Sequence, residues 1–303
     1  MAERVGNSDM MSIGRRALIV LCSVLVCATG APVRVQAQGG SRVTEILVDA
    51  SNGKVLFARS PDALRRPASL TKMMTLYLAF DALKAGRLRP GDTINISAHA
   101  ARQPASRLGV RRGTSIQLSE ALRAIAVSSA NDVTVALAEK LGGTEDRFAR
   151  LMTAKAHQLG MRHTRFANAT GLTNPGNVTT ARDMATLSMA LLRDHPRDYA
   201  VFATRSVRWQ KRRIANHNHL LGRVPGVDGI KTGYTLDAGY NLAASSRHKG
   251  RRLVAVVLGE KSVVDRDVRV SNLLQLGAEQ PRSRPGKAAR MASASGSKRT
   301  ANR

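Results

Sequence analysis

The first apolar runs of the globular part of the chain are separated by a polar turn. Residues 43–49 and 54–58 are rich in Val, Ile, Leu and Phe, and Ser51-Asn52-Gly53 lies between them. Asn-Gly between two apolar runs is a strong signal for a tight turn between antiparallel strands. The pattern therefore predicts a β-hairpin near the start of the globular part.

The next apolar segment has the spacing of a helix. Apolar side chains recur three and four residues apart from Met73 to Phe80, with Pro67 shortly before the segment and Gly86 after it. Proline near a helix start and glycine beyond its end are common punctuation. We therefore expect a buried helix over residues 69–84.

Further patterns place the remaining elements. Strands are predicted at 92–97, 114–118, 240–245 and 252–259, and helices, with their caps, at 119–127, 133–141, 144–159, 180–193 and 265–276. Ser119, Thr144 and Thr180 are the expected caps, and Lys249-Gly250 is the expected turn between the last two strands. Because strands from both ends of the chain enclose many helices, the predicted fold class is α/β (α+β), an antiparallel sheet flanked by helices with an inserted helical lobe.

The charge of the chain favours an anionic environment. Its 303 residues include 48 Lys and Arg against 21 Asp and Glu, a formal net charge of +27, which points to anionic partners or surfaces. The length allows one large domain or two ordinary ones, and 43% hydrophobic residues indicate a folded core. Aromatic residues make up only 3% and no helix-turn-helix, zinc-knuckle or RRM signature is found, so no nucleic-acid partner is expected.

The N-terminal segment has the features of an export signal. Residues 17–31 are apolar, follow two arginines and precede the small-x-small sequence Val35-Gln36-Ala37. This predicts a secretory signal peptide over residues 1–37, cleaved near Ala37; an uncleaved N-terminal anchor is the alternative. Cys22 and Cys27 both fall in this segment, so the exported chain, periplasmic or associated with the cell envelope, has no disulfide framework.

The C-terminal segment has a different composition. Residues 281–303 consist mainly of Arg, Lys, Ser, Ala, Gly and Pro without periodicity. Such a segment buries too little apolar surface to fold, so we predict a disordered basic tail. Residues 38–280 remain and are predicted to form a single folded domain.

A serine and a lysine three residues apart begin the predicted 69–84 helix. Residues three apart lie on one helix face, so the Ser69 hydroxyl and the Lys72 amine can meet. Serine needs an adjacent base to become a nucleophile, and lysine serves as that base only when burial or a nearby cation lowers its pKa. The pattern alone is weak, because an N-cap serine followed by a solvated lysine explains most such pairs.

Two further short motifs follow, Ser129-Ala130-Asn131 and Lys231-Thr232-Gly233. The first lies at a predicted break between helices, where side chains can project into a cleft. In the second, just before the last strand pair, glycine allows a substrate backbone to approach a strand edge and lysine offers a cation to a carboxylate. An interhelical serine cap and a hairpin turn are the structural alternatives. If Lys72 shares the cleft with Lys231, each should lower the other's pKa.

The segment Asn216-His217-Asn218-His219 raises the question of a metal. Two histidines two residues apart on an extended segment could share one face and bind a metal ion. No cysteine and no carboxylate cluster lies nearby in the sequence, so hydrogen bonding or cleft lining is favoured. We predict no metal site and no cofactor.

The three motifs occur in the order given for penicillin-binding proteins and serine β-lactamases. Their surroundings, including residues 66–75 and 227–235, closely resemble the low-molecular-mass penicillin-binding proteins, the D-alanyl-D-alanine carboxypeptidases, and the resemblance runs from about Ser41 to Gly277. It implies a β-lactamase/transpeptidase-like fold. It also implies a serine enzyme that removes the terminal D-alanine from peptidoglycan stem peptides and that β-lactams inhibit.

The resemblance also implies the catalytic roles. Ser69 attacks the substrate carbonyl and forms the acyl-enzyme, and Lys72 takes the proton of its hydroxyl. Ser129 and Lys231 relay a proton to the leaving D-alanine.

Substrate binding is implied in the same way. Asn131 would hold the substrate amide, and Lys231 and Thr232 would face its terminal carboxylate. The oxyanion hole would consist of backbone N–H groups, one of them from Tyr234, which follows Gly233, and the other from the nucleophilic serine.

Several alternatives share this scaffold. Class A β-lactamases deacylate with a glutamate, and none lies between Glu145 and Glu260, which disfavours that activity. A D,D-endopeptidase that cuts cross-links would use the same residues, and a non-catalytic cell-wall-binding protein is the alternative from another class. Family members commonly carry a β-rich domain and a membrane-binding helix, whereas only the basic tail follows Gly277. We therefore expect a soluble or loosely bound enzyme whose tail and arginine-rich surface bind anionic envelope polymers.

Overall fold

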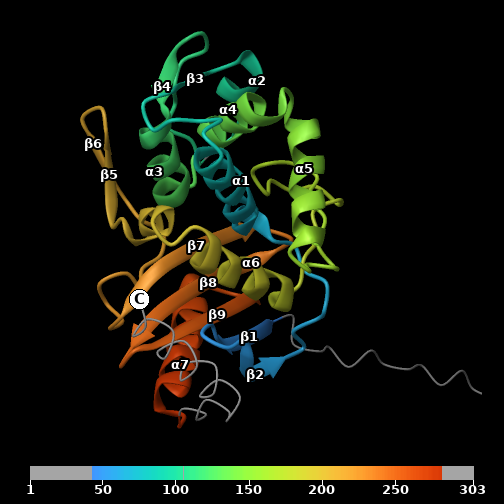
Figure 1. Ribbon diagram of the computed structural model, residues 1–303, viewed down its shortest axis with the longest axis vertical. Coiled ribbons are helices and arrows are strands. Elements are labelled where there is room, and N and C mark those ends of the chain that lie inside the picture. The colour runs from blue at the N-terminus through green and yellow to red at the C-terminus, as the bar shows by residue number, and fades with distance from the viewer. Residues whose placement is uncertain (1–42, 105, 282–303) are drawn as a thin grey trace, which may run out of the picture. The chain divides into compact units, whose positions relative to one another are not determined.

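A five-stranded antiparallel sheet forms the base of the fold (Figure 1). The computed structural model describes residues 43–104 and 106–281; the predicted signal peptide and residues 282–303 of the predicted tail lie outside them. The strand order is β2-β1-β9-β8-β7, with bounds β1 Thr44–Asp49, β2 Lys54–Arg59, β7 Val227–Thr235, β8 Gly239–His248 and β9 Arg251–Glu260. Strands from both ends of the chain share one sheet, which confirms the predicted fold class.

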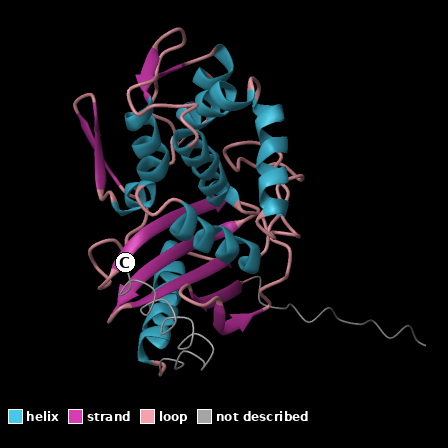
Figure 2. Cartoon of the chain, viewed as in Figure 1, coloured by secondary structure: helices cyan, strands magenta, loops and turns pink. Residues whose placement is uncertain are grey.

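The chain between β2 and β7 supplies most of the helices (Figure 2). The helices are η1 Ala68–Thr71, α1 Lys72–Lys84, α2 Ala98–Ala101, α3 Leu118–Ser128, α4 Asn131–Gly142, α5 Glu145–Gln158, α6 Ala181–Asp194, η2 Asp198–Ala203 and, after β9, α7 Val263–Glu279. Two small hairpins are added, β3 Thr93–Asn95 with β4 Ser115–Gln117 and β5 Ser206–Trp209 with β6 Arg212–Ala215. The inserted helical lobe is thus present as predicted.

The sheet buries different side chains on its two faces. Successive residues of a strand point to opposite faces, so Ile46 and Val48 of β1 join a core that includes Leu187 of α6. Leu47 joins a second, smaller core with Val270 of α7. The two helices accordingly cover opposite faces of the sheet (Figure 1).

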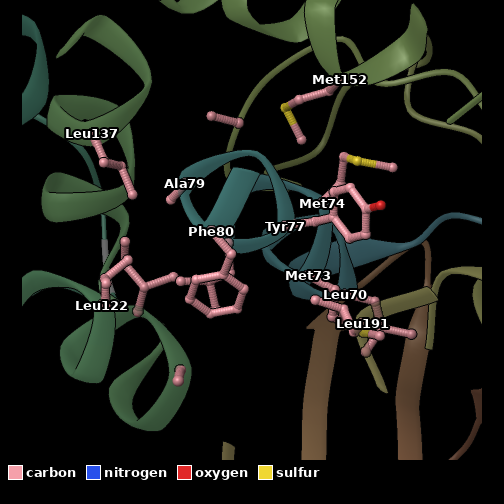
Figure 3. Close-up of a cluster of buried hydrophobic side chains, with 14 of the residues drawn as sticks. Leu70, Met73, Met74, Tyr77, Ala79, Phe80, Leu122, Leu137, Met152 and Leu191 are labelled. Carbon is pink, nitrogen blue, oxygen red and sulfur yellow. The ribbon is translucent and has the colours of Figure 1, made fainter. Parts of the chain in front are cut away.

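Helix α1 is buried on nearly all sides. Leu122 of α3, Leu137 of α4, Met152 of α5 and Leu191 of α6 surround it (Figure 3). A helix that is apolar around most of its circumference must lie in a core. Lys72, its first residue, is therefore held in place by the packing of the whole lobe.

Two of the three predicted helix caps are confirmed. The hydroxyls of Thr144 and Thr180 each accept a hydrogen bond from the backbone N–H three residues later, at 3.2 and 3.0 Å. The prediction for Ser119 is wrong, because α3 begins at Leu118 directly after β4 and no side chain caps it. The next helix, α4, also starts two residues before its predicted start.

Strand β7 is the largest difference from the prediction. The Lys231-Thr232-Gly233 motif lies inside this strand, neither ahead of the strand pair nor in a hairpin turn. Its buried positions include Lys231 and Thr232, so apolar and polar residues do not alternate and the pattern gives no strand signal. The β5–β6 hairpin was not predicted either.

Helix length and hydropathy bear on membrane insertion. Across the described residues, no helix combines the length and the apolar character that crossing a bilayer requires.

Candidate active site

Ser69 and Lys72 meet where η1 passes into α1. The Lys72 amine donates a hydrogen bond to the Ser69 hydroxyl at 3.0 Å. The lysine side chain is fully buried, whereas the serine is half-buried. Ala68, just before the serine, has φ +47°, a left-handed conformation that costs energy for a residue with a Cβ. Such strain is concentrated at functional sites, and here it shapes the turn that carries the serine.

A backbone carbonyl fixes the other side of the lysine amine. The Thr170 carbonyl accepts a second hydrogen bond from Lys72 at 2.7 Å. The segment around it packs tightly on the η1 turn, because a Cβ on Gly171 would lie 1.8 Å from the Ala68 carbonyl oxygen. With two acceptors in a dry environment, the amine has a defined position.

The surroundings favour the neutral form of this amine. Burial lowers the pKa of Lys72 well below its ordinary value, the Lys231 cation lowers it further, and the Glu145 carboxylate raises it. A lysine with a lowered pKa can accept a proton near neutral pH. The predicted effect of Lys231 on Lys72 is confirmed.

Lys231 and Thr232 are both buried within β7. Burial lowers the pKa of Lys231 to about 7, and the Arg266 guanidinium contributes to the lowering. The Lys231 amine donates to the Thr232 carbonyl oxygen at 3.0 Å. Of the predicted mutual lowering, the effect of Lys231 on Lys72 is the part that is observed.

The β7 strand runs close beside the Ser69 turn. A Cβ on Gly233 would lie 3.0 Å from both the Ser69 nitrogen and the Pro67 carbonyl oxygen, so this close approach requires glycine. Asn241 of β8 donates to the carbonyls of Arg66 and Pro67 at 2.9 and 3.1 Å. The chain leading to the serine is thus clamped to the sheet.

Ser129 and Asn131 lie where α3 meets α4. Ser129 has φ +58°, and its buried hydroxyl has no hydrogen-bond partner within the structure as described. The Asn131 amide donates to the Pro104 carbonyl at 2.9 Å, and its backbone N–H donates to the Ser106 carbonyl at 2.7 Å. Buried hydroxyls are nearly always paired, so this one is a candidate for contact with a ligand. Ser129 does not cap α4, because Ala130 occupies the N-cap position.

Tyr234 follows Gly233 at the exposed end of β7. Its side chain is 47% exposed and its ring stacks on Tyr240 of β8, with centroids 4.3 Å apart. Because Gly233 adjoins the Ser69 turn, the backbone N–H groups of Tyr234 and Ser69 belong to neighbouring chain segments.

The histidine pair shows no arrangement typical of a metal centre. His219 Nδ1 lies 3.1 Å from a carboxylate oxygen of Asp267. Among residues 43–104 and 106–281, no three His, Cys, Asp or Glu side chains converge as metal ligands would.

Comparison with known proteins identifies the family. The model of the peptidase S11 family, D-alanyl-D-alanine carboxypeptidase, matches residues 32–262. The chain belongs to this family. It is 34% identical to the D-alanyl-D-alanine carboxypeptidase DacF of Bacillus subtilis, covering 89% of this chain and 73% of that protein. It is 38% identical to DacA of Escherichia coli K12, covering 77% of this chain but only 59% of the relative's length.

Solved structures agree with this assignment. Penicillin-binding protein 5 from Haemophilus influenzae is similar with a TM-score of 0.75 and 37% sequence identity, covering 77% of this chain and 70% of that one. The S11 chain therefore has the fold of the penicillin-binding proteins, as the sequence resemblance implied.

Sequence reasoning missed several groups that build the S11 site. The carboxylate of Asp132 is fully buried and accepts hydrogen bonds from three successive backbone N–H groups, those of residues 108–110, at 2.9 to 3.2 Å. It fixes the loop that contacts Asn131. Asn241 and the Thr170 carbonyl were missed as well. Asp132 had a usable sequence signal, since it is a charged residue placed directly after a motif.

Proposed function

We propose that the protein is a serine-type D-alanyl-D-alanine carboxypeptidase that removes the terminal D-alanine from peptidoglycan stem peptides and is acylated by penicillin. The observation that carries this proposal is the 3.0 Å contact between the Ser69 hydroxyl and the buried Lys72 amine, whose pKa is lowered. This is a nucleophile beside a base that can be neutral at working pH. The S11 relatives carry the same activity in their names.

The acylation step uses the lysine as general base. As the Ser69 oxygen attacks the carbonyl carbon of the penultimate D-alanine, its proton passes to Lys72. The negative charge on the carbonyl oxygen is stabilised by the backbone N–H groups of Ser69 and Tyr234. The C–N bond then breaks, and the leaving amine receives a proton through Ser129 and Lys231. A water molecule later hydrolyses the ester and releases the shortened peptide.

Substrate binding draws on β7 and on the start of α4. Lys231, with a pKa of about 7, is partly protonated near neutral pH, and with Thr232 it faces the terminal carboxylate. Gly233 lets β7 lie directly against the Ser69 turn, so that a substrate backbone beside the strand edge would lie next to the nucleophile, and Asn131 holds the substrate amide.

The test is release of D-alanine from a stem pentapeptide, together with labelling by a fluorescent penicillin and mapping of the labelled residue by mass spectrometry. We expect release of one D-alanine from each pentapeptide, and a single penicillin label, on Ser69. A label without release would favour a D,D-endopeptidase, which cleavage of cross-linked dimers would reveal. A folded protein with neither activity would favour a non-catalytic cell-wall-binding protein.

We further propose that the protein works in the cell envelope, after removal of residues 1–37, and that its cationic surface and basic tail bind anionic envelope polymers. A specific observation supports this. Five exposed cations lie on the β5–β6 hairpin or directly before it: Arg205, Arg208, Lys211, Arg212 and Arg213. Among the described residues, none of the five forms an ion pair. Unpaired exposed cations on one hairpin create a positive field that attracts polyanions.

The contribution of these cations is measured as the affinity of the protein for purified cell-wall sacculi. Changing Arg208, Arg212 and Arg213 to glutamine is expected to weaken binding severalfold at low salt, and the loss should fade at high salt because exposed charges are screened. The matched control changes two exposed arginines of α5, Arg147 and Arg150, together with Arg87. Equal weakening by both sets would mean that only net charge matters, and unchanged binding after removal of residues 282–303 would exclude the tail.

A further inference from the structure

Glu145, the first residue of α5, joins two parts of the structure behind the serine–lysine pair. Its side chain is 14% exposed. One carboxylate oxygen accepts a hydrogen bond from the Ala169 backbone N–H at 3.0 Å. The other oxygen lies 2.8 Å from Nε2 of His99 in α2. The two oxygens of this carboxylate therefore hold two separate segments.

The contact to Ala169 acts on the segment that fixes the lysine. Ala169 precedes Thr170, whose carbonyl accepts the Lys72 amine at 2.7 Å. The Ala169 carbonyl in turn accepts a hydrogen bond from the Thr75 hydroxyl of α1 at 2.8 Å. The Ala169–Thr170 backbone is thus held on one side by two side chains of α1 and on the other side by Glu145.

The charge of Glu145 acts on the same amine. Burial and the Lys231 cation of β7 lower the pKa of Lys72, and Glu145 of α5 is the group that raises it. On its far side, Glu145 faces the exposed imidazole of His99. Removing this carboxylate would leave burial and the Lys231 cation unopposed.

We propose that Glu145 is a positioning residue for acylation, because it holds the Thr170 carbonyl where that carbonyl directs the Lys72 amine at Ser69. The inference rests on the proposed function, in which Lys72 is the base. The negative charge has a second consequence: it keeps Lys72 protonated to a higher pH than the rest of the environment would allow.

Two substitutions separate these effects. Glu145→Gln keeps an oxygen that can accept from the Ala169 N–H but removes the charge, and Glu145→Ala removes both. Asp146→Asn is the matched control, because Asp146 is an exposed carboxylate at the same helix end. The readout is the rate of acylation by a fluorescent penicillin as a function of pH, with thermal unfolding as a check of folding.

For Glu145→Gln we expect a maximal acylation rate within about threefold of the wild type and an acid limb shifted to lower pH, since the Lys72 pKa falls when the carboxylate charge is lost. For Glu145→Ala we expect the maximal rate to fall about tenfold or more, because small displacements of a catalytic group are costly. The Asn control should match the wild type.

A wild-type maximal rate in folded Glu145→Ala would overturn the positioning role. If that variant does not fold, an unmoved acid limb in Glu145→Gln would still contradict the charge effect on Lys72 on which the inference depends. Failure of the proposed function is seen separately, as wild-type protein that penicillin acylates but that releases no D-alanine from a pentapeptide.

Discussion

Replacing Lys72 by methionine is expected to lower the rate of acylation at Ser69 by about a thousandfold or more, with little loss of folded protein. General-base catalysis typically contributes about 10² to 10⁴ in rate, and here the same side chain also orients the hydroxyl at 3.0 Å. Methionine is unbranched and apolar, so it suits a fully buried position. The lost partner of the Thr170 carbonyl costs about 1–3 kcal/mol of stability.

The second-order rate of acylation by a fluorescent penicillin measures this effect, with the unfolding temperature recorded in parallel. Lys72→Arg is the informative companion, because arginine stays charged at any working pH and cannot accept the proton; it should be inactive as well. Lys140→Met, at an exposed position of α4, is the control for loss of a lysine charge. A Lys72→Met variant that is acylated at the wild-type rate would remove Lys72 from the mechanism.

Replacing Gly171 by alanine is expected to cost about 3 kcal/mol or more in the free energy of unfolding and most of the acylation activity. Gly171 has φ +78°, and a Cβ there would lie 1.8 Å from the Ala68 carbonyl oxygen and 2.7 Å from the Thr71 hydroxyl oxygen. The backbone must move to relieve this overlap, and overpacking costs of this kind are about 1–3 kcal/mol on top of the left-handed strain. The movement separates Thr170 from the turn that carries the nucleophile.

Gly143→Ala separates strain from steric overlap. Gly143 has nearly the same positive φ, +79°, but a Cβ there would meet nothing within 4 Å. Denaturant unfolding should show a loss of about 1 kcal/mol for this control, with normal acylation. If both variants lose the same free energy of unfolding and both are acylated at the wild-type rate, the packing of Gly171 on the Ser69 turn does not contribute to function.

Locally encoded features could be predicted from the sequence. The Asn52-Gly53 turn and the Thr144 and Thr180 caps depend on a few neighbouring residues, and α1 has an uninterrupted apolar spacing. The three-residue spacing of Ser69 and Lys72 predicted that their side chains meet, and the hydrogen bond between them is the strongest point of agreement at the site.

Features that depend on distant segments could not be predicted. β7 borders the candidate active site and contains buried polar residues there. The alternation of apolar and polar residues that marks an ordinary strand is therefore absent. The Thr170 carbonyl is a backbone group without a sequence signature. Glu145 illustrates the same difficulty: no motif in the sequence marks it, yet its carboxylate binds the segment that fixes Lys72. Only the folded chain brings residues 72, 145 and 170 together.

The position of β1 in the sheet has a consequence for how the chain is synthesised. β1 pairs with β2 on one side and with β9 on the other, and β9 ends at Glu260. A nascent chain that has not yet reached this residue therefore has an open sheet, with the inner edge of β1 unpaired. Closing a loop of some 200 residues is slow compared with forming local helices. Nearly the whole domain must therefore be present before it can close, and a chain truncated ahead of β9 would expose a strand edge that favours aggregation.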